Sequence, residues 1–370
     1  FNDTATTEIY TLSLHDALPI SMAFMMPTIM MIMNGLSLAI YWIGAVLIND
    51  AQDMQEKFTL FSDMVVFSSY AMQVVMSFMM LVMIFIMLPR ASVAAKRILE
   101  VLDTEPSIED GTRDTFPVMK DGEVEFKDVS FKYPDAEEYV LEHISFSAKK
   151  GETIAFIGAT GCGKSTAINL IPRFYDATEG EVFVDGVNVK EYTQEALHNK
   201  IGYVSQKAIL FSGTIADNVA YGENGKAPAT QDDIAMAVKV AQASEFVEKK
   251  DQGYDGYVAQ GGSNFSGGQK QRLSIARAIA RQPEILIFDD SFSALDYKTD
   301  RILREALRKE CKDATKIIVA QRIGTIRDAD KIIVLDDGQI AGMGTHDELM
   351  KNCEVYQEIA YSQLSKEELA

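Results

Sequence analysis

The chain has 370 residues, 47% of them hydrophobic, and a formal net charge of −19. This length suffices for one large domain with an appendage or for two ordinary domains. The acidic balance argues against nucleic-acid binding, because recognition of a phosphate backbone leaves a basic footprint. Residues 1–90 hold seven acids and two bases, a balance of −5, so −14 falls on the remainder as a solvated acidic surface.

The three cysteines are Cys162, Cys311 and Cys353. Their spacing matches neither a disulfide framework nor a CxxC zinc pattern. We therefore expect reduced thiols in a cytosolic setting and no metal–thiolate site.

Residues 1–20 differ in character from the rest of the chain. The segment FNDTATTEIYTLSLHDALPI begins with Phe and lacks the basic start and apolar core of a signal peptide. It resembles the peptide obtained when sequencing-adapter DNA is translated. We expect residues 1–20 to be a non-native artefact and give them no functional interpretation.

Two charge-free stretches, Met22–Ile48 and Met64–Leu88, come next, and 14 of the 18 methionines lie between Met22 and Met87. Each stretch exceeds the roughly 20 apolar residues that span a bilayer. We predict two transmembrane helices within residues 21–90; the alternative is a buried core helix of a soluble protein. The methionines either fill packing gaps, which is the favoured interpretation, or line a substrate path.

The flanking charges predict an orientation. The loop between the stretches is mainly acidic, and three basic residues follow the second stretch, namely Arg90, Lys96 and Arg97. The positive-inside rule therefore places that end in the cytoplasm, with a short external loop. Residues 91–117 are expected to extend the second helix inward and then to form a polar linker to a domain at 118–365.

Strand and helix patterns alternate from about residue 122 onward, which predicts a layered α/β domain. Expected strands are Thr153–Ile157, Glu181–Val184, Ile201–Val204, Ile285–Phe288, Lys316–Val319 and Ile332–Leu335. Expected helices are Ser165–Ile171, Asp232–Val240, Ser266–Arg281 and Thr299–Lys309. Asp185-Gly186 and Asp337-Gly338 predict hairpin turns.

A phosphate-binding loop stands between the first strand and the first helix of this series. Residues 158–165 read GATGCGKS, which matches G-x-x-x-x-G-K-[ST] in the strand–helix context that the motif requires. Such a loop turns backbone N–H groups toward a β-phosphate, its lysine reaches the β- and γ-phosphates, and its hydroxyl ligates Mg²⁺. The expected binding residues are Gly158, Thr160, Gly161, Cys162, Gly163, Lys164, Ser165 and Thr166.

A second strand, Ile285–Phe288, ends in two acids, Asp289 and Asp290. Buried carboxylates need a partner, and the Mg²⁺ of a bound nucleotide supplies one. We predict Mg-ATP as the ligand, with Asp289 and Ser165 on the metal.

Between these elements residues 264–272 read NFSGGQKQR. This segment resembles the signature sequence that defines the ATPases of ABC (ATP-binding-cassette) transporters. Ser266 can cap the following helix while the next two glycines expose N–H groups, which makes a second anion site. The resemblance implies that Ser266, Gly267, Gly268 and Gln269 grip the γ-phosphate of ATP held by a partner domain.

Other positions follow the same family order. Tyr133 matches the aromatic residue that stacks on adenine, with a core tyrosine as the alternative. Gln206 matches the residue that approaches Mg²⁺ and links the site to the membrane domain, and Asp296 ends a loop through which paired domains sense each other. The resemblance covers residues 22–365.

The resemblance implies a fold and an assembly. The fold class is an α/β P-loop NTPase with a RecA-like core, an antiparallel β subdomain and a helical signature subdomain, preceded by an all-α transmembrane hairpin. Membrane helices fused before the ATPase are typical of exporters, so residues 21–90 would be the last two transmembrane helices of one exporter half. The implied setting is a bacterial plasma membrane, with membrane lipid, a second half and an unknown transported substrate as partners.

Two positions depart from the family pattern. Asp290 stands where the family has the glutamate that polarises water, and Gln321 replaces the switch histidine. Asp is one methylene shorter, and an amide carries no positive charge. With Gln206, these are the expected catalytic residues. They resemble the slow ATP site of a heterodimeric exporter, in which the intact signature completes the partner's fast site.

Three alternatives stay open. The first is a homodimer that tolerates Asp290. The second is a nucleotide-gated or regulatory membrane protein, and the third is a soluble ABC ATPase of DNA repair or translation. The charge-free stretches and the acidic surface disfavour the third.

Overall fold

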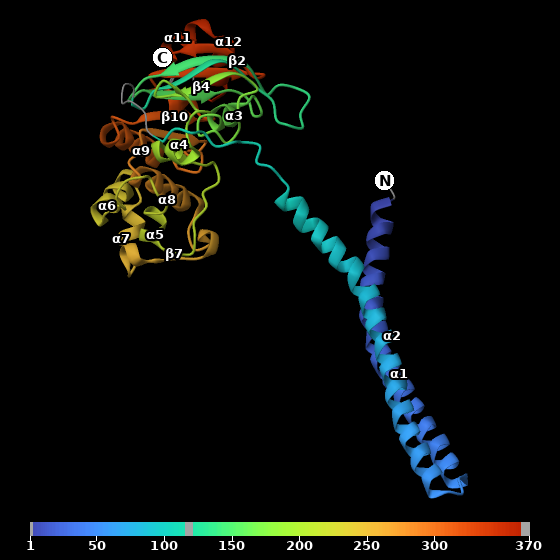
Figure 1. Cartoon of the computed structure of the whole chain (residues 1–370). Coiled ribbons are helices and arrows are strands. Elements are labelled where there is room, and N and C mark those ends of the chain that lie inside the picture. The colour runs from blue at the N-terminus through green and yellow to red at the C-terminus, as the bar shows by residue number, and fades with distance from the viewer. Residues whose placement is uncertain (1–2, 115–120, 364–370) are drawn as a thin grey trace. The chain divides into compact units, whose positions relative to one another are not determined.

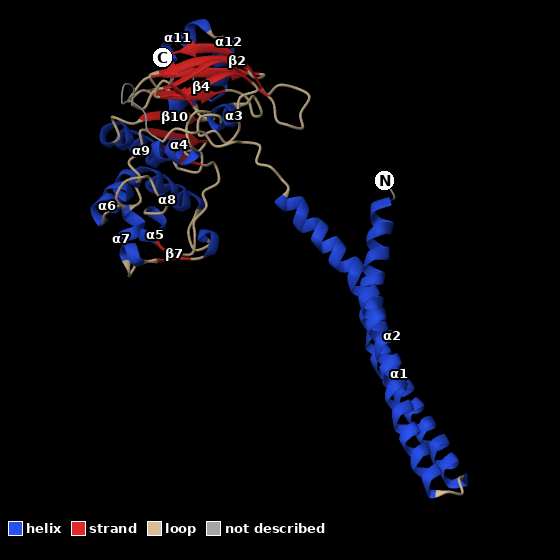
Figure 2. Cartoon of the chain, in the orientation of Figure 1, coloured by secondary structure: helices blue, strands red, loops and turns tan. Residues whose placement is uncertain are grey.

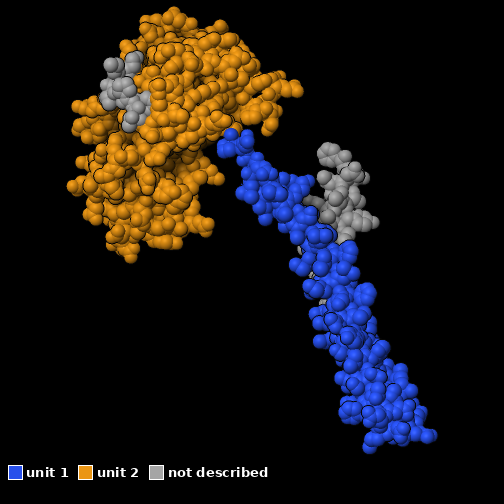
Figure 3. All heavy atoms as spheres, viewed as in Figure 1, with its two compact units in different colours: residues 1–106 blue, residues 107–370 orange. Residues whose placement is uncertain are grey.

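The computed structural model describes residues 3–114 and 121–363. The chain separates into two units, Phe1–Pro106 and Ser107–Ala370, which Figure 3 colours separately. The domain boundary predicted at residues 117–118 and the domain end predicted at residue 365 lie outside the described residues. The artefact predicted at residues 1–20 stays a prediction.

The first unit is a pair of long helices, α1 (Asp3–Asp50) and α2 (Met54–Leu102), joined by a short loop (Figure 1). By length and composition, Met26–Asp50 and Met54–Leu102 are able to cross a membrane. Many of their described large apolar side chains are exposed, including Trp42 at 73% and Phe58 at 76%. A soluble core helix buries such residues, so this exposure disfavours that alternative.

The two helices approach closely at Gly44. A Cβ atom there would lie 2.7 Å from Cγ of Met64, so glycine is what admits the methionine side chain. At this position methionine fills a packing gap between helices. Helix α2 continues through Pro89 to Leu102, so residues 91–102 are helical.

The second unit is built on a six-stranded sheet in the order β12-β11-β3-β10-β9-β6. Its strands are β3 (Thr153–Ile157), β6 (Ile201–Val204), β9 (Ile285–Asp289), β10 (Thr315–Val319), β11 (Lys331–Asp336) and β12 (Gln339–Gly344). Neighbours are parallel except β11 and β12. The strands β3, β9 and β10 are short apolar runs with almost every side chain buried, as a sheet covered on both faces requires.

A four-stranded antiparallel sheet, in the order β2-β1-β4-β5, packs over the first. Its strands are β1 (Val124–Phe131), β2 (Leu141–Ala148), β4 (Glu179–Val184) and β5 (Val187–Asn188). The aromatic rings of Phe126, Phe146 and Phe156 fill the layer between the sheets, with centroids 4.5 and 5.4 Å apart in sequence order. The β4–β5 turn has φ of 55° at Asp185 and 77° at Gly186, which confirms the predicted hairpin turn.

Helices surround the sheets, and one group forms a separate lobe (Figure 2). The lobe contains α5 (Ile215–Val219), α6 (Gln231–Val240), α7 (Ser244–Glu248) and α8 (Gly267–Ala280), two 3₁₀ turns (Gly253–Asp255 and Gln260–Gly262), and the short strands β7 (Gly213–Thr214) and β8 (Tyr257–Val258). The other helices are α3 (Lys164–Asn169), α4 (Gln194–Lys200), α9 (Tyr297–Glu310), α10 (Ile323–Ile326), α11 (His346–Asn352) and α12 (Glu354–Gln363).

The predicted fold class is confirmed. The six expected strands correspond to β3, β4, β6, β9, β10 and β11, and the four expected helices to α3, α6, α8 and α9. The parallel sheet carries the phosphate loop, the antiparallel sheet covers one of its faces, and the signature segment starts a helix of the separate lobe.

A charged cluster joins the two sheets away from the phosphate loop. Lys200 Nζ lies 2.8 Å from Oδ2 of Asp185 and 2.8 Å from Oε2 of Glu284. The Asp185 side chain is 7% exposed. Burial raises the pKa of Asp185 against the lowering effect of Lys200. The ammonium group therefore offsets part of the cost of burying the Asp185 carboxylate where the β4–β5 turn meets the start of β6.

We predict that Lys200→Met lowers the stability of this unit by about 2 kcal/mol, because it leaves a buried carboxylate without its partner. Without the ammonium group the folded-state pKa of Asp185 rises further above its unfolded value. The native state then binds a proton more tightly, so the variant regains stability as the pH falls from 7.5 to 5.5. Calorimetric unfolding of the full chain at both pH values measures this.

Lys249→Met is the matched control, since Lys249 pairs with Glu245 at 2.7 Å while both side chains are more than 70% exposed. That variant should leave the stability of the unit unchanged. A Lys200→Met loss no larger than the control, or equal at both pH values, would contradict the prediction.

Candidate active site

The phosphate loop connects β3 to α3 and depends on glycine. Gly161 has φ of 91° with open space around it, so its backbone conformation alone requires glycine. Gly163 has φ of 94°, and a Cβ there would lie 2.9 Å from the carbonyl oxygen of Val140. Thr160 is exposed on the loop, whereas Cys162 and Thr166 are buried beneath it.

The side chain of Lys164 folds back onto the backbone of this loop. Its Nζ donates to the carbonyl oxygens of Gly158 at 2.8 Å and Ala159 at 2.6 Å, and only 9% of the residue is exposed. Both acceptors are neutral, so the ammonium charge keeps its attraction for an anion. The loop therefore places a fixed positive charge beside glycine backbone that no side chain covers. A positive charge next to accessible N–H groups is what phosphate binding needs.

Parallel pairing brings β9 beside this loop. Strand β10 pairs with β3 on one side and β9 on the other, so their carboxyl ends share one edge of the sheet. There Ser165 Oγ donates to Oδ1 of Asp289 at 2.7 Å. Two of the three expected metal ligands, Ser165 and Asp289, are thus in direct contact although they lie 124 residues apart in the chain.

Tyr203 is a site residue to which the sequence analysis assigned no role. Its hydroxyl donates to Oδ1 of Asn169 at 2.9 Å and lies 3.4 Å from Oδ2 of Asp289. Burial, together with the charge of Asp289, raises the pKa of Tyr203, so the phenol stays protonated as a donor. The available signal was its place at the end of a strand, three residues before Gln206.

Asp290 is the point where the three expected catalytic residues meet. Its Oδ2 accepts from Nε2 of Gln321 at 2.8 Å and from Nε2 of Gln206 at 3.2 Å. The residue is 7% exposed and has φ of 44°, a left-handed conformation at the end of β9. Burial raises the pKa of Asp290, as does the neighbouring charge of Asp289, although hydrogen bonds from adjacent side chains oppose the shift.

The donor set fits a hard, strongly hydrated cation. The described residues contain no group of three or more His, Cys, Asp or Glu side chains arranged for a metal. Ser165 and Asp289 supply two oxygens instead. Mg²⁺ commonly binds one or two protein oxygens and completes its shell with water and substrate phosphates. The residues therefore fit a magnesium ion that arrives with a nucleotide.

Tyr133 lies beside the phosphate loop. Its hydroxyl is 3.1 Å from Oγ1 of Thr166, and its ring meets those of Phe131 and Tyr175 edge-on at 5.0 and 5.2 Å. The residue is half-buried. These contacts fix the ring next to the loop, and stacking on adenine stays a prediction.

The signature segment begins α8. Ser266 Oγ accepts from the backbone N–H of Gln269, and Oε1 of Gln269 accepts from the N–H of Ser266 at 3.0 Å, so the two residues close a capping box. Ser266 and Gly267 are exposed. In Figure 1 α8 lies in the helical lobe, apart from α3 and the phosphate loop. The structure therefore does not bring the signature to this chain's own phosphate loop.

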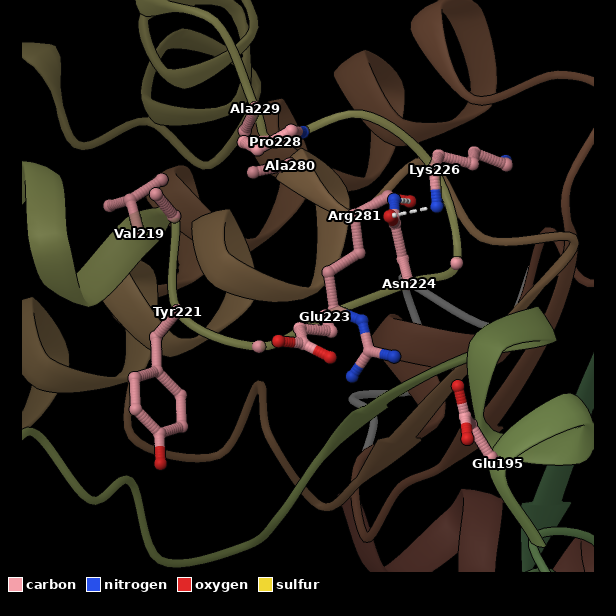
Figure 4. Close-up of a pocket in the computed structure, with 13 residues that line it drawn as sticks. Glu195, Val219, Tyr221, Glu223, Asn224, Lys226, Pro228, Ala229, Ala280 and Arg281 are labelled. Atoms are coloured by element: carbon pink, nitrogen blue, oxygen red, sulfur yellow. Dashed lines mark hydrogen bonds between the residues drawn. The ribbon is translucent and has the colours of Figure 1, made fainter.

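A cavity of about 610 Å³ opens elsewhere in the unit (Figure 4). It is lined by the segment that follows α5, by Ala280 and by the side chains of Glu195, Glu223 and Arg281. In Figure 4 the Arg281 guanidinium points into the space between Glu223 and Glu195, and its Nη2 donates to the carbonyl oxygen of His198 at 3.0 Å. None of the expected phosphate or catalytic residues lines this cavity.

Comparisons with known proteins identify the same kind of nucleotide-binding domain as these residues indicate. Residues 141–293 match the family model described as ABC transporter. An ABC transporter ATP-binding protein of Mycobacterium tuberculosis is 44% identical over 342 residues, which cover 92% of this chain and 57% of that protein. The ATP-dependent lipid A-core flippase of Haemophilus influenzae is 42% identical over 75% of this chain and 46% of its own length.

A solved structure covers both units. The structure of a bacterial Atm1-family ABC exporter with ATP bound aligns with a TM-score of 0.75 and 30% identity, over 98% of this chain and 63% of that one. The chain spans about half the length of the curated relatives it matches.

We predict that Lys164→Ala strongly lowers labelling of this chain by an ATP photoprobe used below its wild-type dissociation constant. Losing a charge-assisted contact to phosphate should weaken binding by about tenfold or more. Lys150→Ala, which removes an exposed lysine of the same unit, is the control and should label normally. Wild-type labelling of Lys164→Ala would exclude the phosphate loop as the binding site.

Proposed function

The chain belongs to the ABC transporter family, and we propose that it forms part of one half of an exporter that binds and hydrolyses ATP to move a substrate across a bacterial plasma membrane. The observation that carries the proposal is the convergence of Lys164, Ser165 and Asp289 at one edge of the parallel sheet. The names of its relatives, a lipid flippase and an exporter among them, support export as the direction of transport.

Each residue at this edge has a role in the proposed reaction. Lys164 binds the β- and γ-phosphates, the loop amides orient them, and Tyr133 packs against adenine. Ser165, Asp289 and Gln206 would hold Mg²⁺, which neutralises phosphate charge when bound. Asp290 accepts the proton of the attacking water, and Gln321 holds the Asp290 carboxylate in place.

We propose further that this chain's own site is slow. The Asp290 carboxylate sits roughly 1–1.5 Å further from the water position than a glutamate would, and small misplacements cost large factors in rate. Its Oδ2 already accepts two amide hydrogen bonds. Gln321 is neutral and adds no positive charge where negative charge develops in the transition state.

The signature supports a role in trans. Its capping box is complete and its glycines are accessible, yet it lies in the helical lobe, apart from this chain's phosphate loop. We propose that it completes the ATP site of a second, different half with Glu and His at the divergent positions. The alternative is a homodimer that tolerates Asp290 and hydrolyses ATP at both sites.

The first unit, α1 and α2, has the features expected of a membrane-inserted hairpin. Two exposed apolar helices and the basic residues near the end of α2 favour a hairpin that crosses the membrane twice, with the end of α2 in the cytoplasm. In the whole transporter these helices would contact lipid and the other membrane helices.

We predict that Ser266→Arg removes at least about 90% of the ATP turnover of the assembled transporter. The arginine would place a bulky cation where the partner's γ-phosphate binds and disturb transition-state stabilisation there. Steady-state ATPase of the reconstituted pair measures this.

Two controls separate charge from folding. Ser266→Ala loses the helix cap, which costs about 1 kcal/mol of stability, and one expected phosphate contact, but it adds no charge and should lower turnover less than Ser266→Arg does. Gln252→Arg adds the same charge at an exposed position of the helical lobe and should change nothing. Near-normal turnover of Ser266→Arg would show that this signature completes no active site.

We predict that Asp290→Asn lowers turnover of the pair by less than about threefold, whereas replacing the matching acid of the partner costs about two orders of magnitude or more. A base held back from the water contributes little, so its removal loses little. The same steady-state assay on the reconstituted pair distinguishes the two sites. A collapse of turnover with Asp290→Asn alone would identify Asp290 as a working base and refute the slow-site proposal.

A further inference from the structure

The loop that carries Gln321 is held by the last described residue of the C-terminal helix. Gln363 closes a ring of two hydrogen bonds on this loop. Its Nε2 donates to the carbonyl oxygen of Gln321 at 2.7 Å, and its Oε1 accepts from the N–H of Ile323 at 2.9 Å. A single side-chain amide thus satisfies main-chain groups on both sides of Arg322.

This ring supplies a cap that the loop itself lacks. Helix α10 begins at Ile323, and its N-cap residue, Arg322, makes no side-chain capping bond. The first N–H groups of a helix need an acceptor from outside the helix. Gln363 provides that acceptor from α12, 40 residues further along the chain.

Helix α12 is a firm support for such a contact. Tyr356 is fully buried, and its hydroxyl lies 2.8 Å from Nδ1 of the buried His346 on α11. Ala360 is also fully buried, and α12 packs against α10 and β11. The position of Gln363 therefore follows from the core of the unit.

The loop is fixed from its other side as well. The guanidinium group of Arg322 donates to the carbonyl oxygens of Ser293 at 3.1 Å and Leu295 at 3.3 Å. The backbone at residues 321–323 is thus held between α12 and the loop that follows Asp290. From that backbone, the side chain of Gln321 reaches Oδ2 of Asp290 at 2.8 Å.

We propose that Gln363 is a positioning residue for the ATP site: by clamping the backbone at Gln321 and Ile323, it sets the place of the Gln321 amide against Asp290. This inference rests on the proposed function, because Lys164 and Asp290 mark the side of the site where the terminal phosphate would lie. The clamp should matter for ATP, which has that phosphate, and not for ADP.

The test uses the full chain in detergent, without a partner, so that only its own phosphate loop binds nucleotide. Gln363→Met keeps the side-chain length and removes both hydrogen bonds. Amide hydrogen exchange across residues 320–327 should then accelerate at least about threefold. Affinity for Mg-ATP should fall about three- to tenfold, with affinity for Mg-ADP within about twofold of wild type.

Two variants sharpen the interpretation. Gln357→Met is the matched control, because Gln357 lies on the same helix and donates to the carbonyl oxygen of Met350, away from the loop; it should change neither measurement. Gln363→Glu keeps the acceptor for Ile323 but sets a carboxylate against the carbonyl oxygen of Gln321. It should protect the Ile323 amide better than Gln363→Met does, while lowering ATP affinity as much.

The outcomes separate the clamp from the function on which it rests. Unchanged exchange in Gln363→Met, or equal losses of ATP and ADP affinity, would overturn the positioning role while leaving ATP binding intact. Failure of the wild-type chain to bind ATP would overturn the proposed function, and the positioning role with it.

Discussion

The 2.7 Å contact between Ser165 and Asp289 is the interaction on which the site depends. It exists because β10 pairs in parallel with both β3 and β9, which places the ends of two buried strands at one edge. A one-residue slip of either strand would turn its side chains to the opposite face of the sheet. The burial of these strands therefore fixes the site geometry as well as the fold.

The antiparallel sheet and the helical lobe depend on this core in different ways. The antiparallel sheet covers one face of the core through a layer of phenylalanine rings and brings Tyr133 to the phosphate loop. The helices of the lobe pack around α8 in an apolar cluster that also includes residues of β3, β6 and β9, and the signature segment is capped by internal hydrogen bonds. An exposed segment with its polar groups already capped suits the proposed contact with a partner domain.

Much of this arrangement could be predicted from the sequence. The phosphate loop, the strand ending in Asp289 and the hairpin turns have local signatures, because glycine conformations and buried strands restrict the residues allowed. Other features had no local signal. Gln363 lies 42 residues after Gln321, and Tyr203 reaches Asp289 only through the pairing of β6 with β9. Such contacts arise from tertiary packing, which a motif does not encode.

A slow site at Asp290 has to be explained by the distance from its carboxylate to the attacking water, and not by its basicity. Burial raises the pKa of Asp290, which makes the carboxylate a stronger proton acceptor. Basicity alone would therefore favour catalysis. The amide groups of Gln321 and Gln206, which donate to Oδ2 of Asp290, would slow catalysis, because they keep this short side chain from moving toward the water. A histidine at position 321 could carry a charge, which would lower the pKa of Asp290 and attract phosphate, whereas Gln321 only restrains the carboxylate. Asp290 and Gln321 thus replace a charged pair with a rigidly positioned one. The slow-site proposal therefore rests on a carboxylate that is basic but too far from the water.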